Sequence, residues 1–467
     1  MLESNEAFKQ LRTAALARNL AFGALTCLGR HTVTGMITAA GQQFVDWTSA
    51  YRLFAQKRIK TDKLFKIALG GVIKELPFDH EIIAHMDDTI LRKTGKKVTG
   101  SAWRRDPLGP PFHTNFVWGQ RFLQISMALP ENSYCSQSRA IPVDFHHCPT
   151  PKRPGKQAEK WEWDAYNQEK NKNNLSKQGS DRIKMLRQQL DQSGFQEREM
   201  LISVDGSYTN NTVLKSLPKG VTLIGRTRKD TKLYTIPDTS TGVGRKRVYG
   251  DRIPTPEQIR QLDQYPWQSI QAWAAGKTHM FDLKVIRDVR WRAAGGQCDL
   301  QVVIIRPLGY RLTKKSRMLY RQPAYLICTD PGLSIEKLLQ AYLWRWEIEV
   351  NFRDEKTLLG CGEAQVRTEN TVQEIPAFIV AMYAFLLLAS HRATKNGNKA
   401  SLPRPVWYPN RNPQRQTSGD LINLLRTQLW AKALGCNFSS FVNQQLRIKS
   451  QKNKANLLPS ALFYLRK

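Results

Sequence analysis

The stretch YLWRWEIEVNFRDEKTLLG, residues 342–360, carries polar residues spaced along one face of a helix. Arg345, Glu349 and Lys356 follow Tyr342 at offsets of 3, 7 and 14 residues. At about 100° per residue the four lie within roughly 60° of one another, over roughly 21 Å of helix axis. Arg353 falls near the same stripe. A carboxylate flanked by cations suits a phosphate backbone lying along the helix. The alternative is an exposed helix with incidental i,i+4 ion pairs.

Two aspartates follow short apolar runs elsewhere in the chain. Asp87 comes after Ile82–Met86, and Asp205 comes after Met200–Val204. A carboxylate that ends a buried strand lies at the sheet edge where ligand sites of α/β folds gather. Two Asp and one Glu brought together repel unless a cation joins them, and carboxylate oxygens favour Mg²⁺ or Mn²⁺. Asp88 is a rival to Asp87 as the metal ligand. Taken singly, a strand-end Asp also caps turns, and a helical Glu is usually solvated.

The helix pattern resembles the YREK signature of DDE transposases of the insertion-sequence family-four type. Tyr342-x2-Arg345-x3-Glu349-x6-Lys356 matches that signature, Asp87-Asp-Thr resembles its first strand end, and Asp205-Gly-Ser-Tyr resembles the second. The resemblance covers about 82–367. It implies an α/β fold with an RNase H-like mixed sheet flanked by helices. The first Asp is expected on the first strand, the second Asp on the fourth, and the Glu on a later helix.

The resemblance also implies a division of the chain. We expect a helical N-terminal DNA-binding domain, a catalytic core in two parts, a basic and mainly β insertion between those parts, and a basic C-terminal region for DNA binding or dimerisation. These cover, respectively, residues 1–76, 77–215 with 321–395, 216–320, and 396–467. Some relatives flip a base onto a Trp of the insertion, which makes Trp291 a candidate. A packed core Trp is the alternative.

The net charge of the chain is concentrated in two segments. The 467 residues include 71 Lys plus Arg and 39 Asp plus Glu, for a formal charge of +32. Residues 226–317 hold 19 basic and 8 acidic residues, and residues 392–467 hold 14 basic residues and one acid, Asp420. A solvated surface normally mixes signs. We therefore interpret both segments as phosphate-contacting regions, with two solvated surfaces as the alternative.

Hydrophobic patterning predicts the remaining elements. Residues 5–75 are expected to be helical, with a helix start at Thr61, and His31–Ala40 fits either a helix-turn-helix element or a plain helical bundle. We expect two strands in 115–129, an exposed insertion over 130–180, and a long helix from Ser334 to about residue 359. The apolar run 375–390 is interpreted as a buried core helix rather than a membrane span.

Cysteine usage and the amino terminus point to a cytoplasmic protein. The seven Cys form no CxxC pair, which argues against a disulfide framework and fits a reducing compartment. The first residues lack a basic segment followed by an apolar core, so we expect no secretory signal and no membrane partner. A zinc site at His146, His147 and Cys148 is a weaker alternative.

The predicted function is that of a transposase of a bacterial insertion sequence, acting in the cytoplasm on the nucleoid. The resemblance implies binding of double-stranded DNA ends by a homodimer, followed by cleavage and strand transfer with two Mg²⁺ ions, for which Mn²⁺ can substitute. Asp87, Asp205 and Glu349 are the expected catalytic and metal-binding residues. Expected phosphate ligands are Tyr342, Arg345, Arg353 and Lys356. The alternatives are an RNase H-like nuclease or resolvase, and a domesticated DNA-binding protein that no longer cuts.

Overall fold

The computed structural model describes most of the chain. The described residues are 7–8, 10–77, 81–106, 109, 113, 115–131, 136–237, 246–295, 298–311, 313, 316–397, 402, 415–433 and 435. Most of the predicted basic C-terminal region, 396–467, therefore lies outside the described residues.

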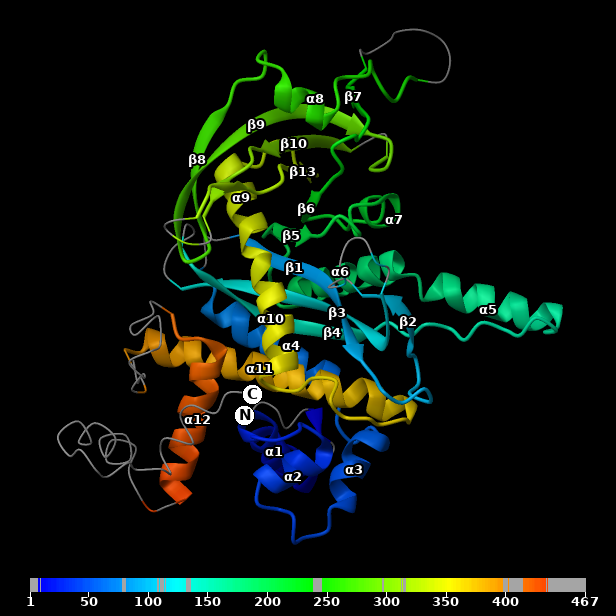
Figure 1. The fold of residues 1–467 in the computed structure, drawn as a ribbon, viewed down its shortest axis with the longest axis vertical. Coiled ribbons are helices and arrows are strands. Elements are labelled where there is room, and N and C mark those ends of the chain that lie inside the picture. The colour runs from blue at the N-terminus through cyan, green and yellow to red at the C-terminus, as the bar shows by residue number, and fades with distance from the viewer. Residues whose placement is uncertain are drawn as a thin grey trace.

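A mixed sheet forms the centre of the molecule (Figure 1). The strand β1 (Ile82–Arg92) pairs antiparallel with β3 (Phe116–Pro130), which pairs antiparallel with β4 (Ser138–His147). On its other side β1 pairs in parallel with β5 (Met200–Val204), and β5 pairs in parallel with β6 (Val221–Arg226). Three antiparallel strands followed by two parallel ones, with helices on both faces, make an RNase H-like α/β fold, as predicted.

The sheet continues without a break beyond β6. Its order runs β6, β13 (Ala324–Cys328), β10 (Asp299–Ile305), β9 (Lys277–Trp291), β7 (Leu233–Thr235), and β8 (Gln268–Ala274) also pairs with β9. At the opposite edge β2 (Ala102–Arg105) pairs with β3. A separate two-stranded sheet joins β11 (Gly309–Tyr310) to β12 (Leu319–Tyr320), and α8 covers Pro256–Gln261. The range 216–320 thus contains the core strand β6 as well as most of the added β structure.

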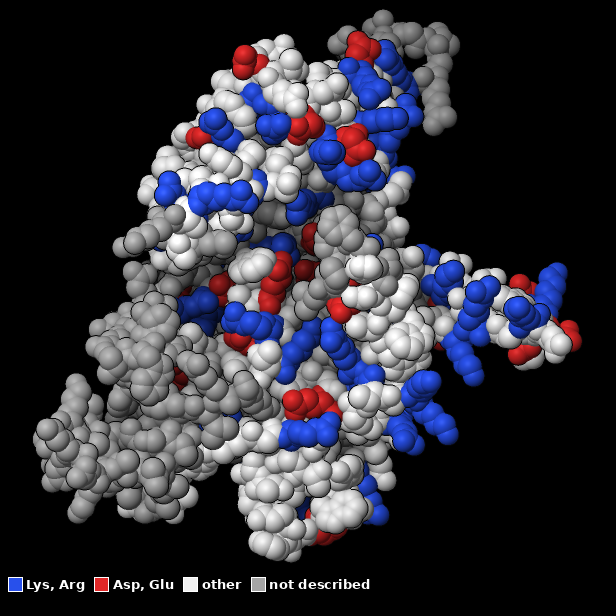
Figure 2. All heavy atoms as spheres, in the orientation of Figure 1, with Lys and Arg blue, Asp and Glu red and all other residues white. Residues whose placement is uncertain are grey.

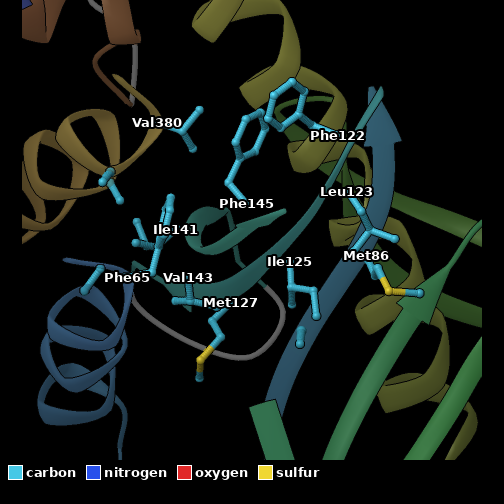
Figure 3. Close-up of a cluster of buried hydrophobic side chains, with 14 of the residues drawn as sticks. Phe65, Met86, Phe122, Leu123, Ile125, Met127, Ile141, Val143, Phe145 and Val380 are labelled. Carbon is cyan, nitrogen blue, oxygen red and sulfur yellow. The ribbon is translucent and has the colours of Figure 1, made fainter. Parts of the chain in front are cut away.

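Helices cover the two faces of the central strands. On one face a large apolar core includes residues of α4 (Thr61–Glu75), α6 (Leu175–Gln192) and α11 (Glu369–Lys395). Figure 3 shows part of this core, where Phe65 of α4 and Val380 of α11 lie close to Ile141 and Val143 of β4. The opposite face is covered by α9 (Ile335–Trp344), whose Leu338 and Ala341 belong to a second apolar cluster. α10 (Trp346–Thr357) extends the line of α9.

The described part of the N-terminal region is mainly helical, as the hydrophobic pattern predicts. It contains α1 (Leu11–Thr26), α2 (Val33–Ala39) and α3 (Thr48–Ala55), and α4 begins at Thr61 as its sequence indicated. A later helix, α12 (Ser418–Ala433), packs against this region, because Arg426 donates hydrogen bonds to the carbonyls of Thr26 and Cys27. The short α7 covers Asn211–Leu214.

The expectation of an exposed insertion over 130–180 is wrong in its first part. Residues 138–147 form β4, which is buried along almost its whole length because its apolar side chains pack under α4 and α11. Only the later part is exposed, where α5 (Lys160–Lys172) has no buried residue and projects from the fold (Figure 1). The two strands expected in 115–129 are one long strand, β3.

α11 contains the apolar run 375–390. Of the described residues, those of α11 form the one helix that is long and apolar enough to cross a membrane, and 72% of its most apolar window is buried inside the fold. Pro376 lies within this helix. The burial agrees with the predicted core helix.

Candidate active site

The strand register places Asp87 beside Asp205. Met86 of β1 is the register partner of Val204, the last residue of β5, so the two aspartates occupy the next position on adjacent parallel strands. The same position on β6 is held by Arg226, since Val204 is paired with Gly225. Neighbouring strands are about 4.8 Å apart. The prediction that Asp87 ends its strand is wrong, because β1 continues to Arg92 through its pairing with β3.

Arg345 connects Asp87 to Glu349. Its Nη1 donates to Oδ2 of Asp87 at 3.2 Å, and its Nη2 donates to Oε1 of Glu349 at 2.7 Å. The side chain of Arg345 is only 12% exposed, whereas that of Glu349 is 35% exposed. Arg345 is the single residue between α9 and α10, and its backbone is helical. The predicted long helix therefore exists as two helices meeting at the residue that joins the acids.

The electrostatics of the site match this arrangement. The pKa of Asp87 is raised to about 7, mainly by burial and in smaller part by the charges of Asp88 and Asp205, while Arg345 and the backbone N–H of Asp88 oppose the rise. Burial opposes the charge of Arg345, but its pKa is still raised above the ordinary value by Tyr342, Asp87 and Glu349. The carboxylates thus hold a permanently charged guanidinium at the site.

Asp88 faces the other side of the sheet. Its Oδ1 accepts a hydrogen bond of 2.8 Å from the hydroxyl of Tyr208, and its Oδ2 lies 3.2 Å from Nε of Arg121. Successive side chains of a strand point to opposite faces, so Asp87 and Asp88 cannot both face α10. Tyr208 belongs to the Asp205-Gly-Ser-Tyr motif. Strand alternation was the signal that could have separated the two rival aspartates.

The four predicted phosphate ligands do not all reach the acids. Tyr342 is half-buried, and its ring centroid lies 5.8 Å from Cζ of Arg345. Arg353 is exposed and donates to Asp354, and Lys356 lies over the ring of Phe352 at 5.9 Å. Neither makes a contact with the three acids in the described part of the chain. Tyr342 and Arg345 therefore belong to the acid site, and Arg353 and Lys356 extend along α10 away from it.

Comparison with known protein families identifies the family of this chain. The model of a family described as DDE superfamily endonuclease matches residues 6–292. The chain belongs to this family. The matched residues include Asp87 and Asp205 and end before α9, so the DDE superfamily match does not itself reach Arg345 or Glu349. No curated protein matches the chain.

DDE endonucleases typically use divalent metal ions. Among the described residues, no group of three His, Cys, Asp or Glu side chains lies close enough together to hold a metal ion. The residues nevertheless fit one in their chemistry. Asp87 and Asp205 supply adjacent hard oxygen donors, and the raised pKa of Asp87 reflects buried negative charge that a cation would relieve. Glu349 would join them only after releasing Arg345.

The surroundings of the three acids are basic. Figure 2 shows acidic side chains in a hollowed region in the middle of the face that it draws. Above them, Lys and Arg side chains are spread over the mainly β part of the chain, residues 216–320. Arg226, which lies at the start of the basic segment 226–317, is exposed beside Asp205. Trp291, the candidate for base stacking, is partly buried and packs against the large apolar core.

Proposed function

We propose that this DDE endonuclease is the transposase of a bacterial insertion sequence of the family-four type, which cuts at transposon ends and transfers the strands to a target. The observation that carries the proposal is the guanidinium of Arg345 between Asp87 and Glu349, at 3.2 Å and 2.7 Å, beside the register position of Asp205. A nuclease site of this composition has acids for metal ions and a cation for the phosphate.

Asp87, Asp205 and Glu349 would hold the metal ions, proposed as two Mg²⁺ that Mn²⁺ can replace. Such ions, when bound, activate water or a 3′-hydroxyl and stabilise the leaving oxygen of an in-line displacement at phosphorus. Arg345 orients the scissile phosphate by donating from two guanidinium nitrogens, and the Tyr342 hydroxyl adds a further donor. Arg353 and Lys356, farther along α10, bind the phosphates that follow.

The proposed partner is double-stranded DNA bound by a homodimer. Exposed cations of the mainly β part support this, among them Lys229, Lys232 and Arg252. Lys and Arg on such a surface bind the phosphate backbone irrespective of sequence. A transposase must bring two ends together, which motivates the dimer. The protein would then act on the nucleoid in the cytoplasm.

The test is DNA cleavage by acid-to-amide variants on the inverted repeats that flank the gene. We expect Asp205→Asn and Glu349→Gln to abolish cleavage while gel-shift binding of the ends stays within a fewfold of wild type. Cutting by Glu349→Gln at the wild-type rate would contradict the assignment.

The family description favours a second candidate, a DNA endonuclease or resolvase without strand transfer. Such an enzyme shares the acid site, so acid variants cannot separate the two. Integration of a labelled, pre-cleaved end into plasmid DNA supports the transposase, and cleavage without any integration supports the nuclease.

A further inference from the structure

The sheet face beneath α9 and α10 changes character along β1. Ile83 belongs to the apolar cluster under α9, and two residues later on the same face stands His85, which is fully buried. The cross-strand partners of His85 are Ser126 on β3 and Ser203 on β5, both also fully buried. The next position on this face is Asp87. A sealed polar layer therefore separates the apolar core under α9 from the acids.

Gln124 is the member of this layer closest to Asp87. It is the direct register partner of Asp87 across the β1–β3 ladder, and it is 0% exposed. Directly opposed residues share a face with Cβ atoms about 5 Å apart. Asp87 thus has an amide side chain as its neighbour on one side and the Asp205 position on the other.

Glu355 of α10 holds this amide. Glu355 is 1% exposed, and its carboxyl group accepts a hydrogen bond from the Gln124 side chain. The Gln124 Nε2 also donates to Oγ of Ser126 at 3.1 Å. An amide nitrogen has two hydrogens, so Ser126 and Glu355 together satisfy both of them. The amide hydrogens of Gln124 are therefore directed away from Asp87.

This arrangement is costly for the fold. Glu355 Oε1, Gln124 Oε1 and both ring nitrogens of His85 are buried without a hydrogen-bond partner among the described residues. The pKa of the Glu355 carboxyl is raised to about 8, mainly by burial and in smaller part by the charge of Asp354, although Gln124 and Lys356 oppose the rise. Buried polar atoms are normally paired, so each unpaired one calls for a role. A leucine at position 355 would remove the buried acid but would leave one amide hydrogen of Gln124 without its acceptor.

We propose that Glu355 is a positioning residue for the acid site: by binding the amide of Gln124 it keeps that amide from donating to the carboxylate of Asp87. The inference rests on the proposed metal-dependent cleavage, because its consequence is that Asp87 stays available to a divalent cation. Without Glu355 an unsatisfied N–H lies one cross-strand step from Asp87 and competes for its oxygens.

The test measures Mn²⁺ binding to the full-length, DNA-free protein by isothermal titration calorimetry, so it does not depend on activity. We expect Glu355→Leu to weaken Mn²⁺ binding by roughly 10- to 100-fold, the size of effects seen for groups that orient metal ligands. Glu355→Gln should bind Mn²⁺ within about twofold of wild type, because its side-chain oxygen still accepts from Gln124. Glu374→Leu, which removes a half-buried acid bonded to Thr61 far along the chain, is the matched control and should leave Mn²⁺ affinity unchanged.

The double variant Gln124→Leu/Glu355→Leu makes the test specific. With no amide left to compete, Mn²⁺ affinity should return to near that of wild type, whereas a merely structural role for Glu355 predicts a double variant no better than the single one. Circular dichroism establishes whether each variant is folded. If Glu355→Leu does not fold, Glu355→Gln and the double variant still test the inference. Unchanged Mn²⁺ affinity in Glu355→Leu, loss in Glu355→Gln, or no recovery in the double variant overturns this inference alone. A wild-type protein that binds no Mn²⁺ overturns the proposed function as well.

Discussion

Arg345 donates a hydrogen bond of 2.7 Å to Glu349, four residues later along the helix, while its other terminal nitrogen reaches Asp87. The guanidinium therefore occupies the position between two of the three acids where a metal ion would bind. A divalent ion that binds all three acids must displace it.

Replacing Arg345 with Gln should separate metal binding from cleavage. We expect Mn²⁺ to bind the DNA-free Arg345→Gln variant more tightly than wild type, because no guanidinium competes for Asp87 and Glu349. Strand cleavage should fall by about two orders of magnitude or more, because the phosphate loses its charged donor. Calorimetry and a cleavage assay measure the two effects. Arg353→Gln, on the exposed part of α10, is the control for charge, and weaker Mn²⁺ binding by Arg345→Gln would contradict the prediction.

Truncation of Asp87 should abolish metal binding, whereas truncation of Asp88 should reduce the stability of the fold. Asp87→Ala is expected to lose Mn²⁺ binding with little loss of stability at neutral pH, because relief of the buried carboxylate, whose pKa is raised to about 7, offsets the hydrogen bond that Arg345 loses. Asp88→Ala leaves the Tyr208 hydroxyl without its acceptor and Arg121 without its ion-pair partner, so its free energy of unfolding should fall by about 1–3 kcal/mol. Urea denaturation measures the stability and Mn²⁺ titration measures the metal binding. Loss of Mn²⁺ binding in Asp88→Ala would contradict the prediction.

Glu355 should make the protein less stable as the pH rises. Its pKa is about 8 in the folded chain against an ordinary value of 4.5, so between these values the unfolded chain releases a proton that the folded chain keeps. The free energy of unfolding then falls with pH across that window, by at most about 1.4 kcal/mol per unit, and the loss is complete above about pH 8. Glu355→Gln removes this dependence. Metal-free urea titrations at several pH values test it, with parallel curves for the two proteins as the contrary result.

The exposed cations of the mainly β part should set the salt dependence of DNA binding. Each of Lys229→Gln, Lys232→Gln and Arg252→Gln is expected to reduce the slope of log affinity against log salt by about 1, if its side chain neutralises one phosphate. Lys160→Gln and Lys170→Gln on the projecting helix α5, where acids alternate with the lysines, serve as charge-matched controls. Equal slopes for both sets would show that the position of the charge is unimportant.

Much of the fold was accessible from sequence because its periodicities are strong. The helix start at Thr61, the strand before Asp205 and the apolar helix around Val380 all follow local rules and occur as expected. β4 was missed because Pro149 and the lysines that follow suggested a loop, and a strand buried by distant helices carries no local signal of its depth.

The site was predicted in its residues but not in its geometry. Helical spacing correctly predicts that Tyr342, Arg345 and Glu349 lie on one side of the helix. It also predicts Arg353 and Lys356 beside them, but these two residues lie farther along α10, beyond the acids. Gln124 and Glu355 could not be recognised from the sequence, since a buried amide and a buried acid look like surface residues. Only the strand register places Gln124 opposite Asp87, and only the packing of α10 brings Glu355 to Gln124. Arg226 was hidden for the same reason, because only the strand register reveals it as a neighbour of Asp205.

The unbroken sheet between β1 and β9 has a mechanical consequence. Five strand spacings separate them, through β5, β6, β13 and β10, which amounts to about 24 Å across the sheet. The mainly β part cannot swing toward the acids as a hinged lid, because the backbone ladder between them would have to break. A duplex touching both β9 and Asp87 would be gripped at points about seven base pairs apart, a footprint set by the width of the sheet.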